Sequence, residues 1–282
     1  SEPGIYDISI KFEGLTSLDY MFGSNMIEII GIDGAFTGTE NATSAEGVFK
    51  YFGDIPIPKQ IFINCSNITN FRQAFNGSEI TEIPPELFKN CTSATNFSEC
   101  FANCSGIVSV PPRLFANCVN ATGFESCFTW CGSLIDVGDS VFANCTNATN
   151  FSWCFQGCTS LTTLGDGIFA NCVSATNFNG CFQSCVSLTT LGDDIFANCT
   201  SATDFSRCFQ SCTSLTNIPD KLFDNCLTIT NLYNCFYNCT GLEGEAPDLW
   251  NRNNMASDID ARGCFGRCVG LSNYDAIPEG WK

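Results

Sequence analysis

The chain has 282 residues, of which 29 are acidic and 12 are basic, so its formal net charge is −17. It has no cluster of lysines and arginines, which makes nucleic acid and anionic membranes poor partners. It also has no run of about 18 apolar residues, so no membrane insertion is expected. Composition does not shift along the chain, which predicts one elongated domain. Because the chain begins at Ser1 without Met or a signal segment, we expect a mature form or a fragment of a longer protein.

The ends of the chain differ from its centre. Residues 1–14 predict an N-terminal cap strand, because Ile5 to Phe12 alternates between apolar and polar residues, and Ile27 to Ile32 reads as an early, irregular repeat. Residues 15–242 predict a repeat solenoid. Residues 243–282 predict a last irregular repeat and a C-terminal cap, in which Trp250 and Trp281 close the final coil, since terminal repeats are expected to be atypical.

A period of 26 or 27 residues fills the centre of the chain. Such a period is typical of a solenoid, in which each unit buries its apolar face only against its neighbours. About ten coils are expected, and at about 4.8 Å per stacked strand they would form a rod of roughly 50 Å. Two Phe series follow the period: Phe62, Phe88, Phe115, Phe142, Phe169, Phe196 and Phe223, and Phe75, Phe101, Phe128, Phe155, Phe182, Phe209 and Phe236.

Each coil contains two half-units of one pattern. Ile168 to Phe178 and Cys181 to Leu191 both read as apolar, Phe, two small or polar residues, Cys, and then two more apolar positions. We expect each half-unit to form one tight helical turn carrying the Phe, then a short strand, then a corner set by Gly or Pro. The strands are expected at Ala175 to Phe178 and at Leu188 to Leu191. Large interior residues are expected to face small ones across a thin core.

The repeated motif carries a family resemblance. The run C-F-x-x-C-x-S-L-x-x-L, followed by x-F-x-N-C-T-S-A-T-N-F-S, resembles the BspA-like leucine-rich repeat proteins, whose units carry an M/A-F-x-x-C-x-x-L-x-x-L core. The similarity extends over residues 15 to 270. Here Cys replaces the usual Met or Ala before Phe, and Cys also occupies the second corner. The resemblance implies a non-enzymatic, surface-exposed recognition or adhesion protein.

The 21 cysteines follow the repeat and have two interpretations. As small hydrophobic residues they can fill a thin core. Alternatively, each Cys-x3-Cys pair can form a disulfide in an oxidising compartment, although residues four apart on a helical turn are near the upper limit for bridging. Zinc is not expected, because the chain has no His. The disulfide candidates are Cys100, Cys104, Cys127, Cys131, Cys154, Cys158, Cys181, Cys185, Cys208, Cys212, Cys235, Cys239, Cys264 and Cys268.

Periodic polar residues point first to structural roles. Asn64, Asn90 and their successors at each period are expected to bond the backbone of the turn in a ladder. Asp139, Asp166, Asp193 and Asp220 each stand three residues before a corner Phe, where they can cap a turn or hold calcium between coils. No other metal and no cofactor is expected. Without His, a phosphate-binding glycine loop or clustered acids, the sequence predicts no enzyme.

Positions beside the Cys-Phe turn vary from coil to coil, which indicates that packing does not dictate them. Trp130 and Trp153 replace residues that are polar in other coils, so we expect them to project from one ridge, one coil apart. Exposed aromatic rings beside Gln and Arg suit contact with carbohydrate or protein; alternatively, the rings pack against each other or against a neighbouring chain. The predicted ligand-binding residues are Glu99, Trp130, Trp153, Gln156, Gln183, Arg207, Gln210 and Tyr237.

These patterns predict a right-handed solenoid, extracellular or displayed at the cell surface, that binds a host protein or glycan along this ridge. One alternative is a virion component, such as a phage fibre or decoration protein that attaches to a host. Another is a structural filament subunit that self-associates, because repeated neutral coils can stack.

Overall fold

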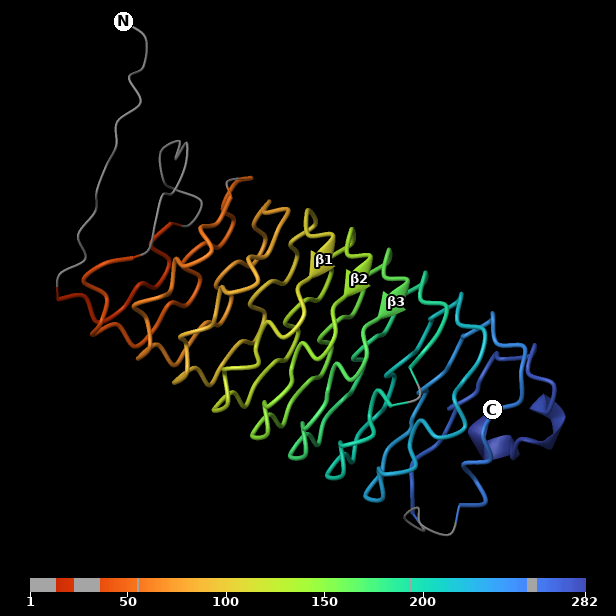
Figure 1. Ribbon diagram of the computed structural model, residues 1–282. Coiled ribbons are helices and arrows are strands. Elements are labelled where there is room, and N and C mark those ends of the chain that lie inside the picture. The colour runs from red at the N-terminus through yellow and green to blue at the C-terminus, as the bar shows by residue number, and fades with distance from the viewer. Residues whose placement is uncertain (1–13, 23–35, 55, 193, 253–257) are drawn as a thin grey trace, which may run out of the picture.

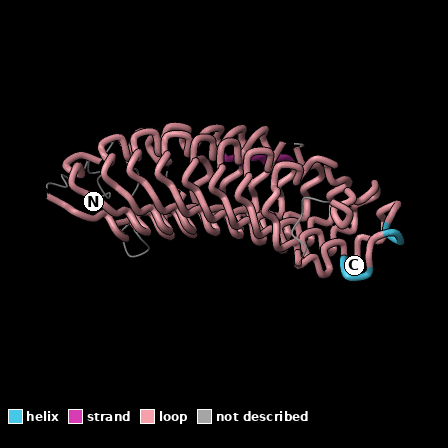
Figure 2. The backbone as a smooth tube through the Cα atoms, turned by 90° about the horizontal axis from the view of Figure 1, so that it is seen from below, coloured by secondary structure: helices cyan, strands magenta, loops and turns pink. Residues whose placement is uncertain are grey.

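The computed structural model describes residues 14–22, 36–54, 56–192, 194–252 and 258–282. Within these residues the chain winds into a rod of stacked coils that runs from the N-terminal to the C-terminal end (Figure 1). Seen at right angles, the rod curves gently (Figure 2). The cap strand expected at Ile5 to Phe12 and the repeat expected at Ile27 to Ile32 lie outside the described residues.

A parallel ladder joins one residue of each coil to the same residue of the next. A strand was expected at Ala175 to Phe178, and one residue of this segment, Asn177, pairs with the neighbouring coils as an isolated bridge. Threonine hydroxyls reinforce this side of the rod; Thr176, for example, donates to the carbonyl of Thr149 at 3.2 Å. In the described chain the ladder runs through Ser17, Ser44, Asn70, Asn96, Gly123, Asn150, Asn177, Asp204, Asn231 and Asp260.

Strands of the second half-unit form in three neighbouring coils. β1 (Ser109–Val110), β2 (Asp136–Val137) and β3 (Thr163–Leu164) pair in parallel and in register. The prediction of a strand at Leu188 to Leu191 is wrong, because these residues form no strand and the backbone bond from the Thr189 amide to the Thr162 carbonyl is long, at 3.4 Å. One marginal bond does not make a paired strand.

The Phe-containing segments are compact turns, as predicted, but their hydrogen bonding is not that of a helix. Phe182 and Ser184 donate their amides to the next coil, to the carbonyls of Cys208 and Gln210, at 2.8 Å each. The intervening amides of Gln183 and Cys185 donate three residues back within the same turn. Half of the amides therefore join neighbouring coils. Among the described residues the only helical segments are the short 3-10 turns η1 (Tyr274–Ala276) and η2 (Glu279–Trp281).

Stacked phenylalanines form the core. Phe151 stacks on Phe124 and Phe178 at centroid distances of 5.3 and 5.4 Å, and its ring meets Phe142 and Phe169 edge to face at 5.0 and 4.8 Å. Large residues therefore face large residues here in a herringbone arrangement, rather than only small ones as expected. Edge-to-face packing suits the ring quadrupole. Because each ring contacts rings of the neighbouring coils, the stack couples coils along the rod.

The last coil ends on tryptophan. The Trp281 ring stacks on Phe265 at 6.3 Å, and the Trp281 carbonyl accepts the Phe265 amide at 2.8 Å. Trp250 meets both of these rings edge to face. Trp281 thus supplies the ring and the carbonyl that a further coil would supply. Within the described residues, no helix has the length and hydropathy needed to cross a membrane.

Candidate functional site on the turn face

The Cys-Phe turns place two columns of residues in the left-handed backbone region, one on each side of the buried Cys-Phe pair. Together with the residue immediately before each of them, these positions form a continuous surface that we call the turn face. All eight predicted ligand-binding residues lie on it. The first column contains Tyr20, Gly47, Gln73, Glu99, Ser126, Trp153, Gly180, Arg207, Asn234 and Gly263, and the second contains Tyr51, Gly77, Asn103, Trp130, Gly157, Ser184, Ser211, Asn238 and Arg267.

Each aromatic residue in these two columns lies over a glycine in the next coil. A Cβ atom on Gly157 would lie 2.5 Å from the Trp130 ring, and one on Gly180 would lie 2.6 Å from Trp153. Tyr20 covers Gly47 in the same way. The glycine accepts both the left-handed backbone and the ring above it, which no larger residue does without strain. Each ring therefore packs directly against the glycine of the following coil.

The two tryptophans lie in neighbouring coils, as predicted, but in different columns. Trp130 is 54% exposed and is the only exposed member of the predicted set. Trp153 is half-buried. Each ring packs against a glycine of the following coil, so its position depends on the stack itself.

The other predicted residues are half-buried and take part in contacts along the turn face. Glu99 accepts hydrogen bonds from Arg72 at 2.8 Å and from Gln73 at 2.6 Å. Gln156 donates to Gln183 at 3.4 Å. The Oε1 atom of Gln210 is buried and, within the described chain, has no hydrogen-bond partner.

Arginines and tyrosines pair near the C-terminal end of the turn face. The Arg207 guanidinium lies 4.9 Å from the centre of the Tyr233 ring, and Arg267 lies 5.4 Å from the centre of the Tyr237 ring. Sequence reasoning missed Tyr233 and Arg267, and it also missed Tyr20 and its partner Gly47. The sequence does contain a signal for the Tyr20 and Gly47 pair: an aromatic residue with Gly one period later indicates a ring that packs over that glycine.

All 21 cysteines are buried free thiols in the structure, so the predicted Cys-x3-Cys bridges are absent from it. The second thiol of each pair has a partner in the preceding coil: Cys131 donates to the Phe101 carbonyl at 3.1 Å and Cys185 to the Phe155 carbonyl at 3.2 Å. Burial raises the pKa of these thiols, that of Cys104 to about 12. This arrangement corresponds to the core-filling interpretation; the disulfides stay a prediction.

Periodic Asn side chains and the side chain of Asp139 bond the backbone. Asn90 donates to the carbonyl of Ile63 at 2.9 Å, Asn117, Asn144 and Asn225 make the equivalent bond, and Asn64 donates to the carbonyl of Phe36, one position earlier in its coil, which confirms the ladder at these positions. The Asp139 carboxylate accepts the amide of Asp166 at 2.9 Å. Asp193 lies outside the described residues. Across the described ranges no group of three or more potential metal ligands gathers.

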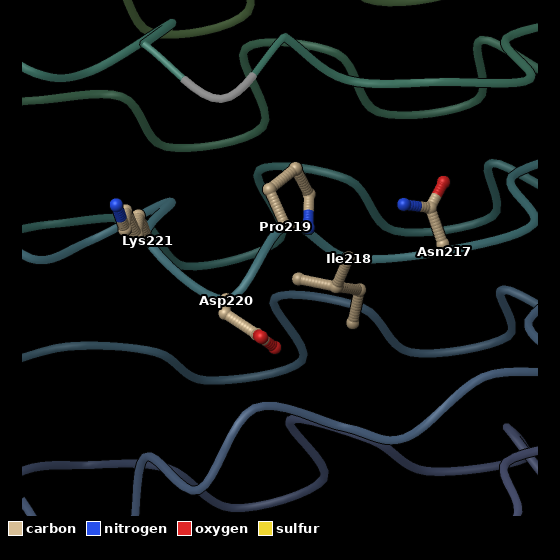
Figure 3. Close-up of a pocket in the computed structure, with 5 residues that line it drawn as sticks. All are labelled: Asn217, Ile218, Pro219, Asp220 and Lys221. Carbon is tan, nitrogen blue, oxygen red and sulfur yellow. The ribbon is translucent and has the colours of Figure 1, made fainter.

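A shallow pocket lies at one corner of a coil, away from the turn face. Asn217, Ile218, Pro219, Asp220 and Lys221 line it. These five residues are consecutive, and the carboxylate of Asp220 and the amine of Lys221 point away from one another (Figure 3). The pocket therefore brings together no pair of groups suited to acid–base catalysis.

The model of the BspA type leucine rich repeat region matches this chain in six copies, over residues 11–125, 55–203 and 108–243. Among solved structures, the chain is similar to a leucine rich cell surface protein from Faecalibacterium prausnitzii, at 16% identity and a TM-score of 0.33, covering 85% of this chain and 80% of that one. It is also similar to a leucine-rich repeat protein from Eubacterium ventriosum, at 16% identity and a TM-score of 0.30, covering 90% and 67%. These are similarities of fold. A search of curated proteins finds no match.

Proposed function

Because this chain belongs to the BspA-type leucine-rich repeat family, as the resemblance predicted, we propose that it is a non-enzymatic recognition protein that binds a glycan or protein along its turn face. The observation that carries the proposal is Trp130. Its ring is fixed over Gly157 and yet 54% exposed. A rigid, exposed aromatic residue loses little entropy on binding and is typical of binding hot spots.

Neighbouring side chains add polar contacts to this platform. Gln156 and Gln183 are half-buried and hydrogen-bonded to each other, so their amides are held in place. Arg207 offers a guanidinium three coils beyond Trp130. An apolar ring surrounded by fixed polar groups is the usual composition of a recognition surface.

We propose an extracellular or cell-surface location. The family assignment and the Ser-, Thr- and Asn-rich surface of the repeats support it. The virion and filament alternatives have no specific observation in their favour.

The test is a binding screen with matched variants. The purified protein is probed against arrays of glycans and of extracellular proteins, and every hit is repeated with the Trp130→Ala/Trp153→Ala double variant. We expect that variant to bind about tenfold more weakly or worse, because alanine removes the ring that makes the contact. Leu227→Ala is the control, since Leu227 is 56% exposed and lies outside the turn face.

A hit whose affinity is unchanged in the double variant, with the fold intact by circular dichroism, would contradict the turn face as the binding surface. Loss of binding in both the double variant and Leu227→Ala would contradict it as well, because the effect would then not be local.

A further inference from the structure

The charges of the turn face are unevenly distributed along the rod. Its carboxylates are Asp19, Glu46, Glu99 and Glu125, and all of them precede Trp153. From Ser152 to Arg267 the turn face carries no carboxylate, although the chain contains 29 acidic residues. Over the same stretch it carries arginines. The C-terminal part of the turn face is therefore a cationic surface on an acidic protein.

Three arginines of this part are held by aromatic rings. Arg207 and Arg262 both contact the Tyr233 ring, at 4.9 and 5.5 Å from its centre, and Arg267 contacts Tyr237. Stacking on the ring face orients a guanidinium and leaves the N–H groups along its edge free to donate. Such edges match carboxylate and sulfate oxygens.

Most of this positive charge is not neutralised within the described chain. Arg262 forms an ion pair with Asp260 at 2.7 Å, and its side chain remains 77% exposed. Arg207 and Arg267 have no carboxylate partner among the described residues. Asp204 lies beside the turn face, where its carboxylate accepts the amide of Ser206 at 2.8 Å. The rest of an acidic chain repels anions, so this patch is where an anionic partner can approach.

The tryptophan platform and the arginines belong to one continuous surface. Backbone hydrogen bonds donated by the amides of Trp153 and Gly180 link each turn to the next, as far as the turn of Arg207. At about 4.8 Å per coil, Trp153 lies about 10 Å from Arg207, and Trp130 lies about 24 Å from Arg267. A flat ring followed by separated guanidinium groups fits a chain of sugar rings, each with an apolar C–H face, that carries acidic groups at intervals.

We infer that the turn face from Trp130 to Arg267 binds an anionic polysaccharide bearing carboxylate or sulfate groups, with sugar rings on Trp130 and Trp153 and acidic groups on Arg207, Arg262 and Arg267. This inference rests on the proposed function and names its ligand class. An acidic protein segment would satisfy the arginines but would leave the tryptophan platform without a role.

Isothermal titration calorimetry with defined probes tests the inference. The probes are hexagalacturonic acid, its fully methyl-esterified form as the neutral counterpart, a heparin hexasaccharide as the sulfated form, and poly-glutamate. We expect one of the two anionic sugars to bind at least about tenfold more tightly than the ester, with affinity falling as salt rises. Arg207→Gln/Arg267→Gln should lose about tenfold in affinity, whereas Arg113→Gln, an exposed arginine outside the turn face, should lose none.

Binding of the ester as tightly as the tighter of the two anionic sugars would overturn the inference and leave the proposed function intact, because the sugar would then bind without its charge. Poly-glutamate binding as tightly as the sugars would identify an acidic protein instead. Failure of both anionic sugars to bind would also overturn it. In each case the array screen of the tryptophan variants reports separately on the proposed function.

Discussion

At the scale of single residues, the turn face depends on pairing a large ring with a missing side chain. Trp153 and Gly180 both have positive φ, 53° and 58°, and occupy the same slot of consecutive coils. A left-handed backbone directs the ring along the stack, where the glycine leaves room for it. The exposed rings are therefore part of the coil packing and are positioned before any ligand arrives.

Gly180→Ala tests this pairing. The new Cβ atom would lie 2.6 Å from the Trp153 ring, so the ring has to move while alanine adopts a left-handed backbone. We expect the free energy of unfolding, measured by urea denaturation, to fall by about 1–3 kcal/mol. Gly244→Ala is the control, because no atom lies within 4 Å of its Cβ position. In a Trp153→Ala background Gly180→Ala should lower the free energy of unfolding by only about 1 kcal/mol, which is the penalty for a left-handed backbone at alanine. An identical cost in both backgrounds would show that the ring and the glycine are not coupled.

The thiols define a second residue-scale prediction. The structure places all 21 cysteines as buried thiols, and a thiolate is the reactive species. Because burial raises the pKa of thiols such as Cys145, to about 12, alkylation of the native protein should be slow. After denaturation without reductant, all 21 should be alkylated, as read by intact mass. If each Cys-x3-Cys pair forms a disulfide, its two cysteines cannot be alkylated. The intact mass would then be lower by two alkyl groups for each pair, which would establish the disulfides predicted from the sequence.

At the scale of the element, one coil is stable only between its neighbours. The turn amides alternate between local bonds and bonds to the next coil, and the phenylalanine rings contact rings one coil away on either side. An isolated coil would lose half of its turn hydrogen bonds and most of its ring contacts. Stability is therefore a sum of nearest-neighbour terms along the rod.

Phe151→Ala should show this locality. Phe151 is fully buried and touches four other rings, so its loss should cost about 3–5 kcal/mol. Hydrogen exchange read by mass spectrometry should accelerate in the coils from Phe124 to Phe178 and stay unchanged near Phe62 and Phe223. Phe151→Leu, which keeps most of the volume, is expected to cost less than about 1.5 kcal/mol. Faster exchange spread evenly over the whole rod would contradict the nearest-neighbour account.

The length of a coil could be predicted from the sequence, but the backbone hydrogen bonding of its turns could not. The repeating phenylalanines fixed the coil length, because burial recurs at the same position in each coil. The helical turn expected at Phe182 and Cys185 was a reasonable inference from apolar residues three and four apart, yet the left-handed residues Gly180 and Ser184 divert alternate amides to the next coil. Spacing alone does not distinguish a helix from such a turn, since both are compact. The strand expected at Leu188 to Leu191 failed for a related reason, because pairing depends on the neighbouring coil.

At the scale of the whole molecule, the buried thiols make stability dependent on alkaline pH. Burial raises the pKa of Cys104, Cys145 and Cys226 to about 12, from an ordinary value of 9.0. Above pH 9 the unfolded chain releases these protons and the folded chain keeps them. Their contribution to the free energy of unfolding is therefore complete below about pH 9. It is lost as pH rises toward 12, by up to about 1.4 kcal/mol for each thiol and each pH unit.

The urea midpoint, followed by tryptophan fluorescence, should therefore be nearly constant from pH 7 to 8 and fall steeply between pH 9 and 11. Cys104→Ala is the informative variant: it should start less stable at pH 7, since it leaves a cavity, and lose stability less steeply with pH. A midpoint that does not change up to pH 11 would contradict proton retention by the folded thiols.

The site could be located from the sequence only in part. Variation between coils singled out eight positions that all lie on the turn face, although Trp130 is the only exposed residue among them and the other seven are half-buried. It was not enough to show that Trp130 and Trp153 occupy different columns, or that Arg207 stacks on Tyr233 in the next coil. Those relations depend on the register between coils and on left-handed turns, which a single repeat does not reveal.

Hydroxyl-radical footprinting shows whether the protein binds its ligand on the turn face. The protein is oxidised alone and with the tightest-binding ligand from the array screen, and side-chain oxidation is read by mass spectrometry. Trp130 and Leu227 are nearly equally exposed, at 54% and 56%, on different faces. We predict that the ligand protects Trp130 and leaves the oxidation of Leu227 unchanged. Protection of Leu227 with Trp130 still fully oxidised would place the binding surface elsewhere on the rod.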